Sequence, residues 1–392
     1  MKLAFVVQRY GADIAGGSEA HCRQLGQRLS RRHEITVLTT CARDYVSWAN
    51  AFPAGEQADG SVRVLRFPVR RRRDIKAFAD ISDEVFDVMA SRDRQDEWFR
   101  QNGPDAPALL EHLRRHGRDY DLVVFWTYRY APSYFGVPLV ADRAVLVPTA
   151  EDDPAIDLSV LHEFFRLPAG YLFLTPEEEA LVSARAGARL VPSAVIGIGV
   201  DPPAPIEAAT VLARHSLPRE FVLYLGRVDR NKGCDTLLEY FQEYAARHDD
   251  GVLVLAGPAK MEIPDHPRIR ALGYVPDDLR DALLASARAL VVPSPYESLS
   301  IVLLEAWNRG VPALVNGRCR VLQGQVRRAN GGLYYRSSRD FAEALTFLLS
   351  HPPQRDLLGS QGRAYVDREY RWETVTARVE DLLAAVMAKA TG

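Results

Sequence analysis

The stretch FVLYLGRVDRNKGCDTLLEYF, residues 221–241, predicts a strand that passes through a glycine-containing turn into a helix. Its first half is apolar without alternation, as expected of a parallel strand covered on both faces. Arg227 and Lys232 lie in the turn beside Gly226 and Gly233, which tolerate close backbone approach or positive φ. The helix start adds partial positive charge and N–H groups. Together these features predict a site for an anion, most simply a phosphate group; the alternative is a solvated turn.

The same alternation of apolar runs and helical patterns extends along the whole chain and is typical of βαβ units. It is interrupted once, at the proline-rich segment DPPAPIEAAT, residues 201–210, which reads as a linker. The predicted strands are residues 3–7, 35–39, 122–126, 144–148, 171–175 and 194–198 before the linker, and 221–226, 251–257, 289–293 and 312–316 after it.

The length of 392 residues suggests two domains, because single cores stop growing at roughly 250–300 residues. We therefore expect an α/β protein with two doubly wound, Rossmann-like domains, residues 1–200 and 201–369. Ligands of such folds bind beyond the carboxyl ends of the strands, so a cleft between the two domains is the expected site.

The composition, 47% hydrophobic and 26% charged, is that of an ordered globular protein. A net charge of −2 argues against a nucleic-acid-binding protein. The four cysteines are scattered, which indicates a reducing compartment and neither zinc nor disulfides. The N-terminal apolar run is too short for a signal peptide, and no stretch approaches the ~18 apolar residues of a membrane span. We expect a cytoplasmic protein, with membrane contact from that side left open.

A second polar cluster is predicted in PSPYESLSIVLLEAWNRG, residues 293–310, where a strand leads into a helix that Ser298 or Ser300 can cap. Glu297 precedes the helix, and Glu305 lies within its apolar part, where a carboxylate needs a partner. Hydroxyl groups suit carboxylates, so this segment beside a phosphate site favours a sugar that carries phosphate. The alternative is that Glu305 is simply an exposed helix residue.

Two further motifs carry weaker signals. Gly16 and Gly17 follow the first strand and are either a flexible loop or a place where the backbone approaches a ligand. Residues 151–153, Glu-Asp-Asp, superficially resemble an acidic metal motif, but a turn before Pro154 explains them equally well. No metal and no cofactor is expected.

Together these motifs resemble the family 4 glycosyltransferases, which are retaining enzymes with the GT-B fold. The resemblance rests on three motifs: GGSE at 16–19, G-R-x-x-x-x-K-G at 226–233 and E-x7-E at 297–305. Residues 198–201, 271–276 and 310–315 support it. It implies that residues 370–392 form a C-terminal helix that packs back on the first domain.

The resemblance also implies roles for individual residues. Arg227 and Lys232 would hold the diphosphate of a nucleotide-sugar and stabilise it as a leaving group, while Glu297 accepts hydrogen bonds from the sugar. The remaining donor-binding residues would be Gly16, Gly17, Val275 beside the base, Ser298, Leu299 and Ser300 through backbone N–H groups, and Glu305 on the ribose hydroxyls.

The implied function is transfer of a hexose from a UDP- or GDP-sugar to an acceptor hydroxyl with retention, without metal, in bacterial glycan or glycolipid synthesis. The departing phosphate oxygen would take the acceptor's proton, so catalysis would rest on positioning and on the two cations.

One departure from the family pattern concerns the transferred sugar. Many relatives have a histidine where this chain has Glu151, which is therefore a candidate to face the sugar; His21 and His162 are alternatives. If Glu151 disables the site, the protein is a non-catalytic sugar-nucleotide-binding protein of GT-B fold. A GT-B epimerase, or a phosphorylase that would need pyridoxal phosphate, is a further alternative.

The first domain is expected to bind the acceptor: a sugar, a glycolipid or a small molecule. Its most basic segment is Arg70–Arg73, close to Arg63, Arg66 and Lys76. A solvated loop is the default interpretation. The more specific interpretation is that the segment contacts an anionic acceptor or an anionic membrane face, because clustered arginines attract anionic headgroups.

Overall fold

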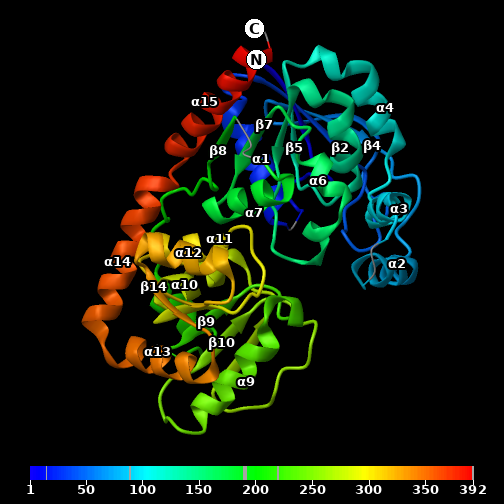
Figure 1. The fold of residues 1–392 in the computed structure, drawn as a ribbon. Helices are drawn as coiled ribbons and strands as arrows, with labels where there is room; N and C mark the ends of the chain where they lie inside the picture. The colour runs from blue at the N-terminus through cyan, green and yellow to red at the C-terminus, as the bar shows by residue number, and fades with distance from the viewer. Residues whose placement is uncertain (15, 88–89, 189–191, 219, 391–392) are drawn as a thin grey trace. The chain divides into compact units, whose positions relative to one another are not determined.

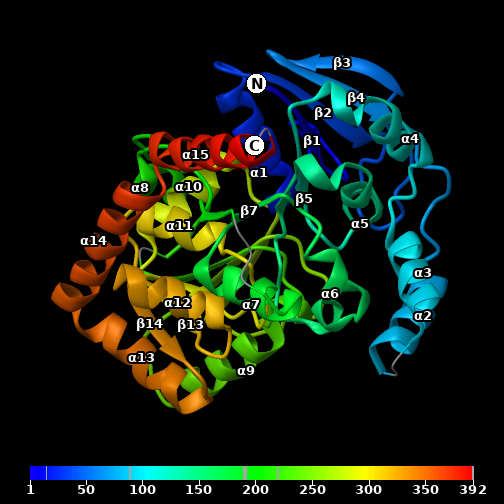
Figure 2. The same cartoon turned by 45° about the horizontal axis from the view of Figure 1, so that its top comes forward.

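The structure, a computed structural model, describes residues 1–14, 16–87, 90–188, 192–218 and 220–390 (Figures 1 and 2). Its internal contacts divide the chain into two compact units. Unit 1 comprises residues 1–198 and 375–392, and unit 2 comprises residues 199–374. Each unit is an α/β layer structure with helices on the faces of one sheet. The predicted fold class, with two doubly wound Rossmann-like units, is confirmed.

Unit 1 is built on an eight-stranded sheet in the order β3-β4-β2-β1-β5-β6-β7-β8. Every neighbouring pair is parallel except β3 with β4 at the edge. The strands are β1 (Lys2–Val6), β2 (Glu34–Thr40), β3 (Gly55–Asp59), β4 (Val62–Phe67), β5 (Leu122–Trp126), β6 (Ala144–Val147), β7 (Gly170–Phe173) and β8 (Ser193–Val195). The central strands are buried on both faces, which explains their uninterrupted apolar sequence.

The helices of unit 1 follow the strands in alternation. They are α1 (Gly17–Leu29), α2 (Ile75–Asp87), α3 (Arg92–Asn102), α4 (Pro107–His116), η1 (Gly117–Asp119), α5 (Ala131–Gly136), η2 (Val137–Arg143), η3 (Pro154–Asp157), α6 (Val160–Phe164) and α7 (Pro176–Ala186). The last helix, α15 (Trp372–Ala390), returns to this unit. There Oε1 of Glu380 lies 2.9 Å from Nε2 of His33. The C-terminal segment is therefore fixed beside the start of β2.

Unit 2 has a six-stranded sheet in the order β11-β10-β9-β12-β13-β14, and its neighbouring strands are parallel. The strands are β9 (Val222–Leu225), β10 (Leu253–Ala256), β11 (Ile269–Gly273), β12 (Ala289–Val292), β13 (Ala313–Asn316) and β14 (Gly332–Tyr335). The helices are α8 (Ala208–Arg214), η4 (Arg230–Lys232), α9 (Cys234–Ala245), α10 (Asp277–Ser286), α11 (Ile301–Asn308), α12 (Arg320–Ala329), α13 (Ser338–Ser350) and α14 (Pro352–Glu369).

All ten predicted strands are present, most with ends within one or two residues of the prediction. The sequence pattern missed four strands: β3, β4, β11 and β14. The polar residues of β3, GEQAD, are largely exposed at the sheet edge and carry no apolar signal. The expected linker, 201–210, is irregular until α8 begins at Ala208. Across the described residues, no helix combines the length and apolar character needed to cross a bilayer.

His21, one of the histidines considered for sugar contact, is a core residue of unit 1. It lies on α1 with its side chain fully buried against Trp126, whose ring centre is 5.9 Å away. The indole Nε1–H of Trp126 donates to Nδ1 of His21 at 3.3 Å, while Nε2 has no hydrogen-bond partner. Burial lowers the pKa of His21 to about 4, so the imidazole is neutral near pH 7. The other alternative, His162, is exposed on α6.

The buried imidazole predicts a specific acid sensitivity. The folded-state pKa of His21 lies below the ordinary 6.5, so its contribution to stability is present above pH 6.5 and is lost as pH falls through about 4. The loss amounts to roughly 3 kcal/mol at full protonation. Urea unfolding at several pH values should show this loss in the native sequence and a shallower decline in His21→Gln, which retains an acceptor for Trp126. If the free energy of unfolding falls equally with decreasing pH in the two proteins, His21 is not the group responsible for the loss.

Candidate functional site

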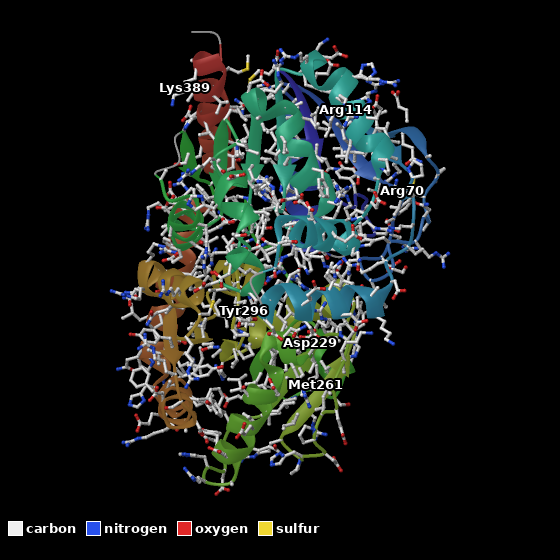
Figure 3. All side chains as sticks on the ribbon, turned by 45° about the vertical axis from the view of Figure 1, so that its right-hand side comes forward. Arg70, Arg114, Asp229, Met261, Tyr296 and Lys389 are labelled. Atoms are coloured by element: carbon white, nitrogen blue, oxygen red, sulfur yellow. The ribbon has the colours of Figure 1, made fainter. Side chains whose placement is uncertain are left out.

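The predicted phosphate turn and the predicted acidic segment meet at one edge of the unit 2 sheet. Strands β9 and β12 are parallel neighbours, with Leu223 opposite Leu290. The turns that follow them, residues 226–233 and 293–300, therefore leave the sheet at the same edge, beyond its carboxyl ends. Asp229 and Tyr296, one from each turn, are labelled in Figure 3.

Asp229 organises the first turn. Its carboxylate accepts from the backbone N–H of Lys232 at 2.9 Å and forms an ion pair with the guanidinium of Arg227. The carbonyl of Arg227 in turn accepts from the hydroxyl of Tyr224 at 2.6 Å. These contacts hold both predicted cations in place. The sequence analysis missed Asp229, although an aspartate three residues before the Lys232 N–H is a capping signal.

Lys232 and Glu297 are in direct contact. The ammonium Nζ of Lys232 donates to Oε1 of Glu297 at 2.8 Å, and the lysine side chain is 35% exposed while the glutamate is 13% exposed. The structure thus brings together two predicted site residues that are 65 positions apart in the sequence. The pair bridges the turns after two neighbouring strands, with the cation on the more accessible side.

Glu305 has a partner that the sequence did not reveal. It lies on α11 and forms an ion pair with the guanidinium of Arg280 from α10. The pair is half-buried. Burial is the largest single effect on the pKa of Arg280 and lowers it, but Glu305 together with Asp281 and Asp277 raises that pKa above its ordinary value. The partner needed by a carboxylate in an apolar helix is therefore an arginine. No local pattern links α10 to α11, so the pairing had no signal in the sequence.

Two glycines allow the turns to pack closely. Gly233 has φ of 72°, and a Cβ there would lie 2.4 Å from the carbonyl oxygen of Pro293. Gly257, which follows β10, has φ of 143°, and a Cβ there would lie 1.9 Å from the carbonyl oxygen of Gly226. Both positions therefore require glycine. Gly233 was singled out from the sequence, whereas Gly257 was not.

The segment 298–300 leads into α11. Ser300 stands at the N-cap position, but its hydroxyl makes no capping hydrogen bond, so the prediction that it caps the helix is wrong. Its backbone N–H donates to Oε1 of Gln325 at 3.2 Å, and Nε2 of that fully buried glutamine has no partner. The N–H of Ser300 is thus already engaged within the protein, whereas backbone donation to a ligand was predicted for Ser298, Leu299 and Ser300 alike. That role stays a prediction.

Val275 lies in the connection between β11 and α10, where it is buried beside the 81% exposed Tyr274. Its predicted place near a base is untested. In unit 1, Gly16 packs against the buried ion pair of Arg9 with Glu19, because a Cβ on Gly16 would lie 2.2 Å from Oε2 of Glu19. Gly17 begins α1.

Glu151 is half-buried in the loop after β6. Its neighbour Asp153 is engaged within the protein, because it pairs with Arg129 and accepts from the N–H of Ala155 at 3.2 Å. The turn interpretation therefore accounts for this aspartate. Within the described parts of the chain, no cluster of histidine, cysteine, aspartate and glutamate is placed to hold a metal ion.

Part of unit 2, including the turns after β9 and β12, matches a known protein family. Residues 219–351 match the family described as Glycosyl transferases group 1. The matched segment is part of unit 2 and contains the turns after β9 and β12 together with Arg280, Glu305 and Gln325. The narrower assignment to family 4 is compatible with the match and stays a prediction.

Curated relatives carry glycosyltransferase names. One is an uncharacterised glycosyltransferase of Methanocaldococcus jannaschii, 25% identical over 43% of this chain and 45% of its own length. Another is a GDP-mannose-dependent phosphatidylinositol monomannoside mannosyltransferase of Mycobacterium tuberculosis, 29% identical over 46% of this chain and 52% of its own. The chain thus spans about half the length of these relatives.

Solved structures match the whole chain and show its fold. Sucrose-phosphate synthase of Thermosynechococcus elongatus superposes with a TM-score of 0.73 at 19% identity, covering 99% of both chains. A trehalose 6-phosphate synthase of Burkholderia multivorans gives a TM-score of 0.74 at 16% identity, also with 99% of both chains covered. The predicted GT-B fold is confirmed by these neighbours.

The tight packing of the turn after β9 predicts that Gly233→Ala destabilises unit 2. Gly310 provides a matched control, because its φ of 76° is nearly the same but no atom lies within 4 Å of a Cβ there. We expect Gly310→Ala to cost about 1 kcal/mol from backbone strain alone. Gly233→Ala should cost at least about 2 kcal/mol more, as overpacking does elsewhere.

Urea unfolding of both variants measures the difference. Equal losses of stability would mean that the turn after β9 relaxes away from Pro293 without cost. That result would contradict the rigid contact between the two turns.

Proposed function

We propose that this protein is a retaining glycosyltransferase that moves a hexose from a UDP- or GDP-sugar to an acceptor hydroxyl. The observation that carries the proposal is the cluster of Arg227, Lys232 and Glu297 at the carboxyl ends of β9 and β12, within the segment that matches the glycosyltransferase family. Two cations and a carboxylate at this edge suit the two halves of a nucleotide-sugar, its diphosphate and its hydroxyl-rich sugar.

The diphosphate would lie against Arg227 and Lys232. Arginine supplies a planar fork of donors and lysine a compact charge. Helix α9 begins at Cys234, and its N-cap residue Gly233, which follows Lys232, provides no side-chain cap, so the N-terminal partial charge of the helix adds to the two cations. In the proposed reaction these groups stabilise the charge that develops as the nucleoside diphosphate departs. No step of the proposal requires a metal ion or a cofactor.

Donor binding would exchange ion pairs instead of exposing buried charges. In the absence of donor, Lys232 is paired with Glu297 and Arg280 is paired with Glu305. An arriving diphosphate attracts Lys232, and Glu297 then becomes available to accept from sugar hydroxyls. Glu305 can likewise accept from ribose hydroxyls while Arg280 stays beside it. Because each carboxylate has a hydrogen-bond donor both before and after the nucleotide-sugar binds, the electrostatic cost of the exchange is small.

Retention is part of the proposal and rests on the resemblance of the sequence motifs to those of retaining enzymes. The leaving phosphate oxygen takes the proton of the acceptor hydroxyl on the face from which it departs, while the new glycosidic bond forms on that face. The protein contributes by holding the reactants and by stabilising the leaving group.

The proposal includes both UDP-sugars and GDP-sugars, because both kinds of nucleotide-sugar occur in the names of similar proteins. The M. tuberculosis relative is named GDP-mannose-dependent, whereas Anabaena HepE, 15% identical with a TM-score of 0.69, was solved with UDP-glucose. We place the reaction in glycan or glycolipid synthesis on the cytoplasmic side. The acceptor would be a sugar, a glycolipid or a small molecule bound by unit 1, with Arg70–Arg73 as the candidate contact to an anionic membrane face.

Removal of the lysine charge should weaken donor binding and transfer. We expect Lys232→Ala to bind UDP or GDP about 10- to 100-fold more weakly, because a charge-assisted contact is lost. Hexosyl transfer should fall about 10²- to 10³-fold. A thermal-shift titration with both nucleotides and a donor-hydrolysis assay measure the two effects.

Arg339→Gln is the matched control, because Arg339 is an 86% exposed residue of the same unit that pairs with Glu343. It should leave both measurements unchanged. Absence of stabilisation of the native protein by any nucleoside diphosphate would overturn the proposal. Binding without turnover across several acceptors would instead support the non-catalytic alternative.

Glu297→Gln should separate binding from transfer. The substitution removes the carboxylate that competes for Lys232, so the affinity for UDP or GDP should stay the same or rise. Transfer should fall about 10²- to 10³-fold, because the contact with the sugar is weakened. Isothermal titration and product formation by mass spectrometry measure the two quantities. A parallel loss of nucleotide affinity would mean that Glu297 holds the turn together instead of serving the sugar.

A further inference from the structure

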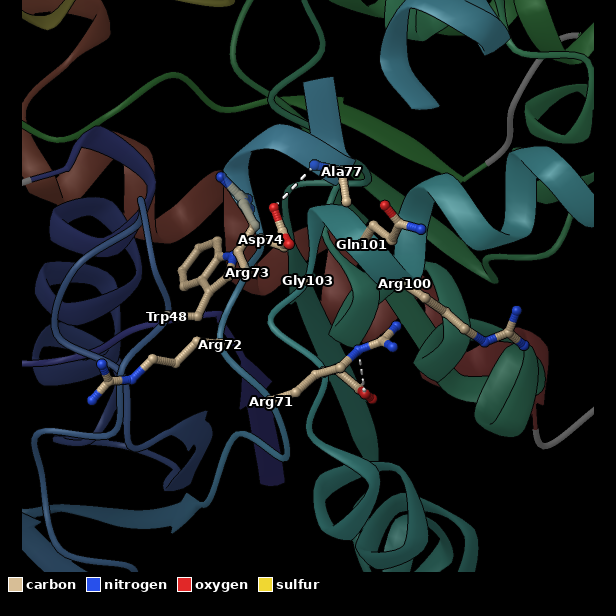
Figure 4. A pocket seen from close by; sticks show the side chains of 10 residues that line it. Trp48, Arg71, Arg72, Arg73, Asp74, Ala77, Arg100, Gln101 and Gly103 are labelled. Carbon is tan, nitrogen blue, oxygen red and sulfur yellow. Dashed lines mark hydrogen bonds and ion pairs between the residues drawn. The ribbon is translucent and has the colours of Figure 1, made fainter. Parts of the chain in front are cut away.

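A basic cavity lies in unit 1 beside the arginine run that the sequence singled out (Figure 4). Its volume is about 250 Å³. The loop after β4, the end of α3 and the indole of Trp48 supply its walls. Four arginines but only two aspartates line it: Arg71, Arg72, Arg73, Arg100, Asp74 and Asp105. Arg100, which closes the cavity from α3, carried no signal in the sequence.

Two of the arginines in the run are structural. Arg70 donates to Asp105 through Nε and Nη2, at 2.9 and 2.7 Å. Arg73 donates to the carbonyl oxygens of Asn102 at 2.9 Å and Tyr45 at 3.1 Å. Its guanidinium lies 5.0 Å from the ring centre of Trp48, and burial lowers its pKa. Arg73 is thus a half-buried cation that is satisfied by carbonyl groups and an aromatic ring.

The other cations of the cavity are only partly compensated by carboxylates. Arg71 lies 3.6 Å from Glu97 and 3.7 Å from Asp105, and Asp105 also pairs with Arg70. Arg100 stacks over Phe135 at 4.7 Å. Neither Arg72 nor Arg100 has a carboxylate within ion-pair distance among the residues described by the structure. In Figure 4 the side chain of Arg72 points away from those of Arg71 and Arg100.

The two aspartates of the cavity have other partners. Asp74 accepts from the backbone N–H of Ala77 at 3.0 Å and so caps the start of α2. Asp105 is the acceptor for Arg70. Because both carboxylates are already engaged, they do little to compensate the positive charge of the cavity.

The wall of the cavity is fixed before any ligand arrives. The indole N–H of Trp48 donates to the carbonyl of Asn102 at 2.7 Å. The next residue, Gly103, has φ of 74°, and a Cβ there would lie 3.0 Å from the Trp48 ring. A preformed site loses little conformational entropy on binding.

We infer that this cavity binds a phosphate group through Arg71 and Arg100. Guanidinium forks match phosphate oxygens, and the cavity has room for a phosphate group but not for a whole nucleotide-sugar. The loop after β4 leaves the sheet at its carboxyl edge, because β4 runs parallel to β2. The inference rests on the proposed function only in assigning this site to the acceptor.

Two kinds of molecule present such a phosphate. A second cavity, of about 370 Å³, shares Arg100 and Asp105 with the first. Its walls include Pro107, Leu110 and Phe135. The basic cavity would therefore hold the phosphate of a soluble compound, or that of a lipid whose apolar part lies along the second cavity.

The test compares the native chain with the double variant Arg71→Gln, Arg100→Gln. Isothermal titration with inorganic phosphate and with glycerol 3-phosphate examines the soluble source. Cosedimentation with phosphatidylcholine vesicles, with and without phosphatidylglycerol, examines the lipid source. Arg115→Gln is the control, because Arg115 is a 71% exposed residue of the same unit that pairs with Glu111 and lines neither cavity.

We expect saturable phosphate binding that the double variant weakens at least about tenfold and the control leaves unchanged. Phosphatidylglycerol-dependent sedimentation that only the double variant loses identifies a lipid phosphate. The inference is overturned if neither probe binds, or if the double variant and the control lose binding equally, which would indicate general charge attraction. No nucleotide is present in these experiments, so their outcome is independent of the donor site in unit 2.

Discussion

The parallel pairing of β9 with β12 is the constraint on which the candidate site depends. With Leu223 opposite Leu290, the turns after the two strands emerge side by side, so Lys232 can reach Glu297 across 65 residues of sequence. The turns could not lie so close with side chains in the way. Gly233 faces the carbonyl of Pro293, and Gly257 faces that of Gly226, at distances that exclude a Cβ. Sheet register and glycine placement therefore locate the charges, and the charges then define the chemistry.

The charges of the site are arranged as exchangeable pairs. Lys232 with Glu297, and Arg280 with Glu305, each leave a carboxylate satisfied and a cation partly accessible. A rigid, fully neutralised cluster would resist a ligand, and an unpaired buried carboxylate would destabilise the fold. Half-buried pairs avoid both penalties. The same principle explains why Asp229 holds Arg227 while it also accepts from the Lys232 backbone, because this keeps a cation oriented without burying it.

Much of this fold follows from sequence periodicity, since strands buried on both faces produce continuous apolar runs such as Leu122–Trp126. The phosphate turn also followed from local signals, namely glycines, cations and a helix start. What could not be predicted depends on contacts between distant segments. Arg280 and Glu305 lie on different helices, and Gln325 reaches Ser300 from α12. Edge strand β3 was missed because a strand exposed to solvent has no need of apolar residues.

The run Arg70–Arg73 shows why charge counts alone do not establish a binding surface. Four identical side chains occupy three environments: Arg70 is paired with Asp105, Arg73 is half-buried against Trp48, and Arg71 and Arg72 line a cavity. The two structural arginines fix the loop, and only that fixed loop lets Arg71 act together with Arg100, which is distant in sequence. A solvated loop would spread its charges over many conformations and bind any anion weakly. Here Arg73 packs against Trp48 and fixes part of the run in one conformation, so the remaining charges are held in defined positions.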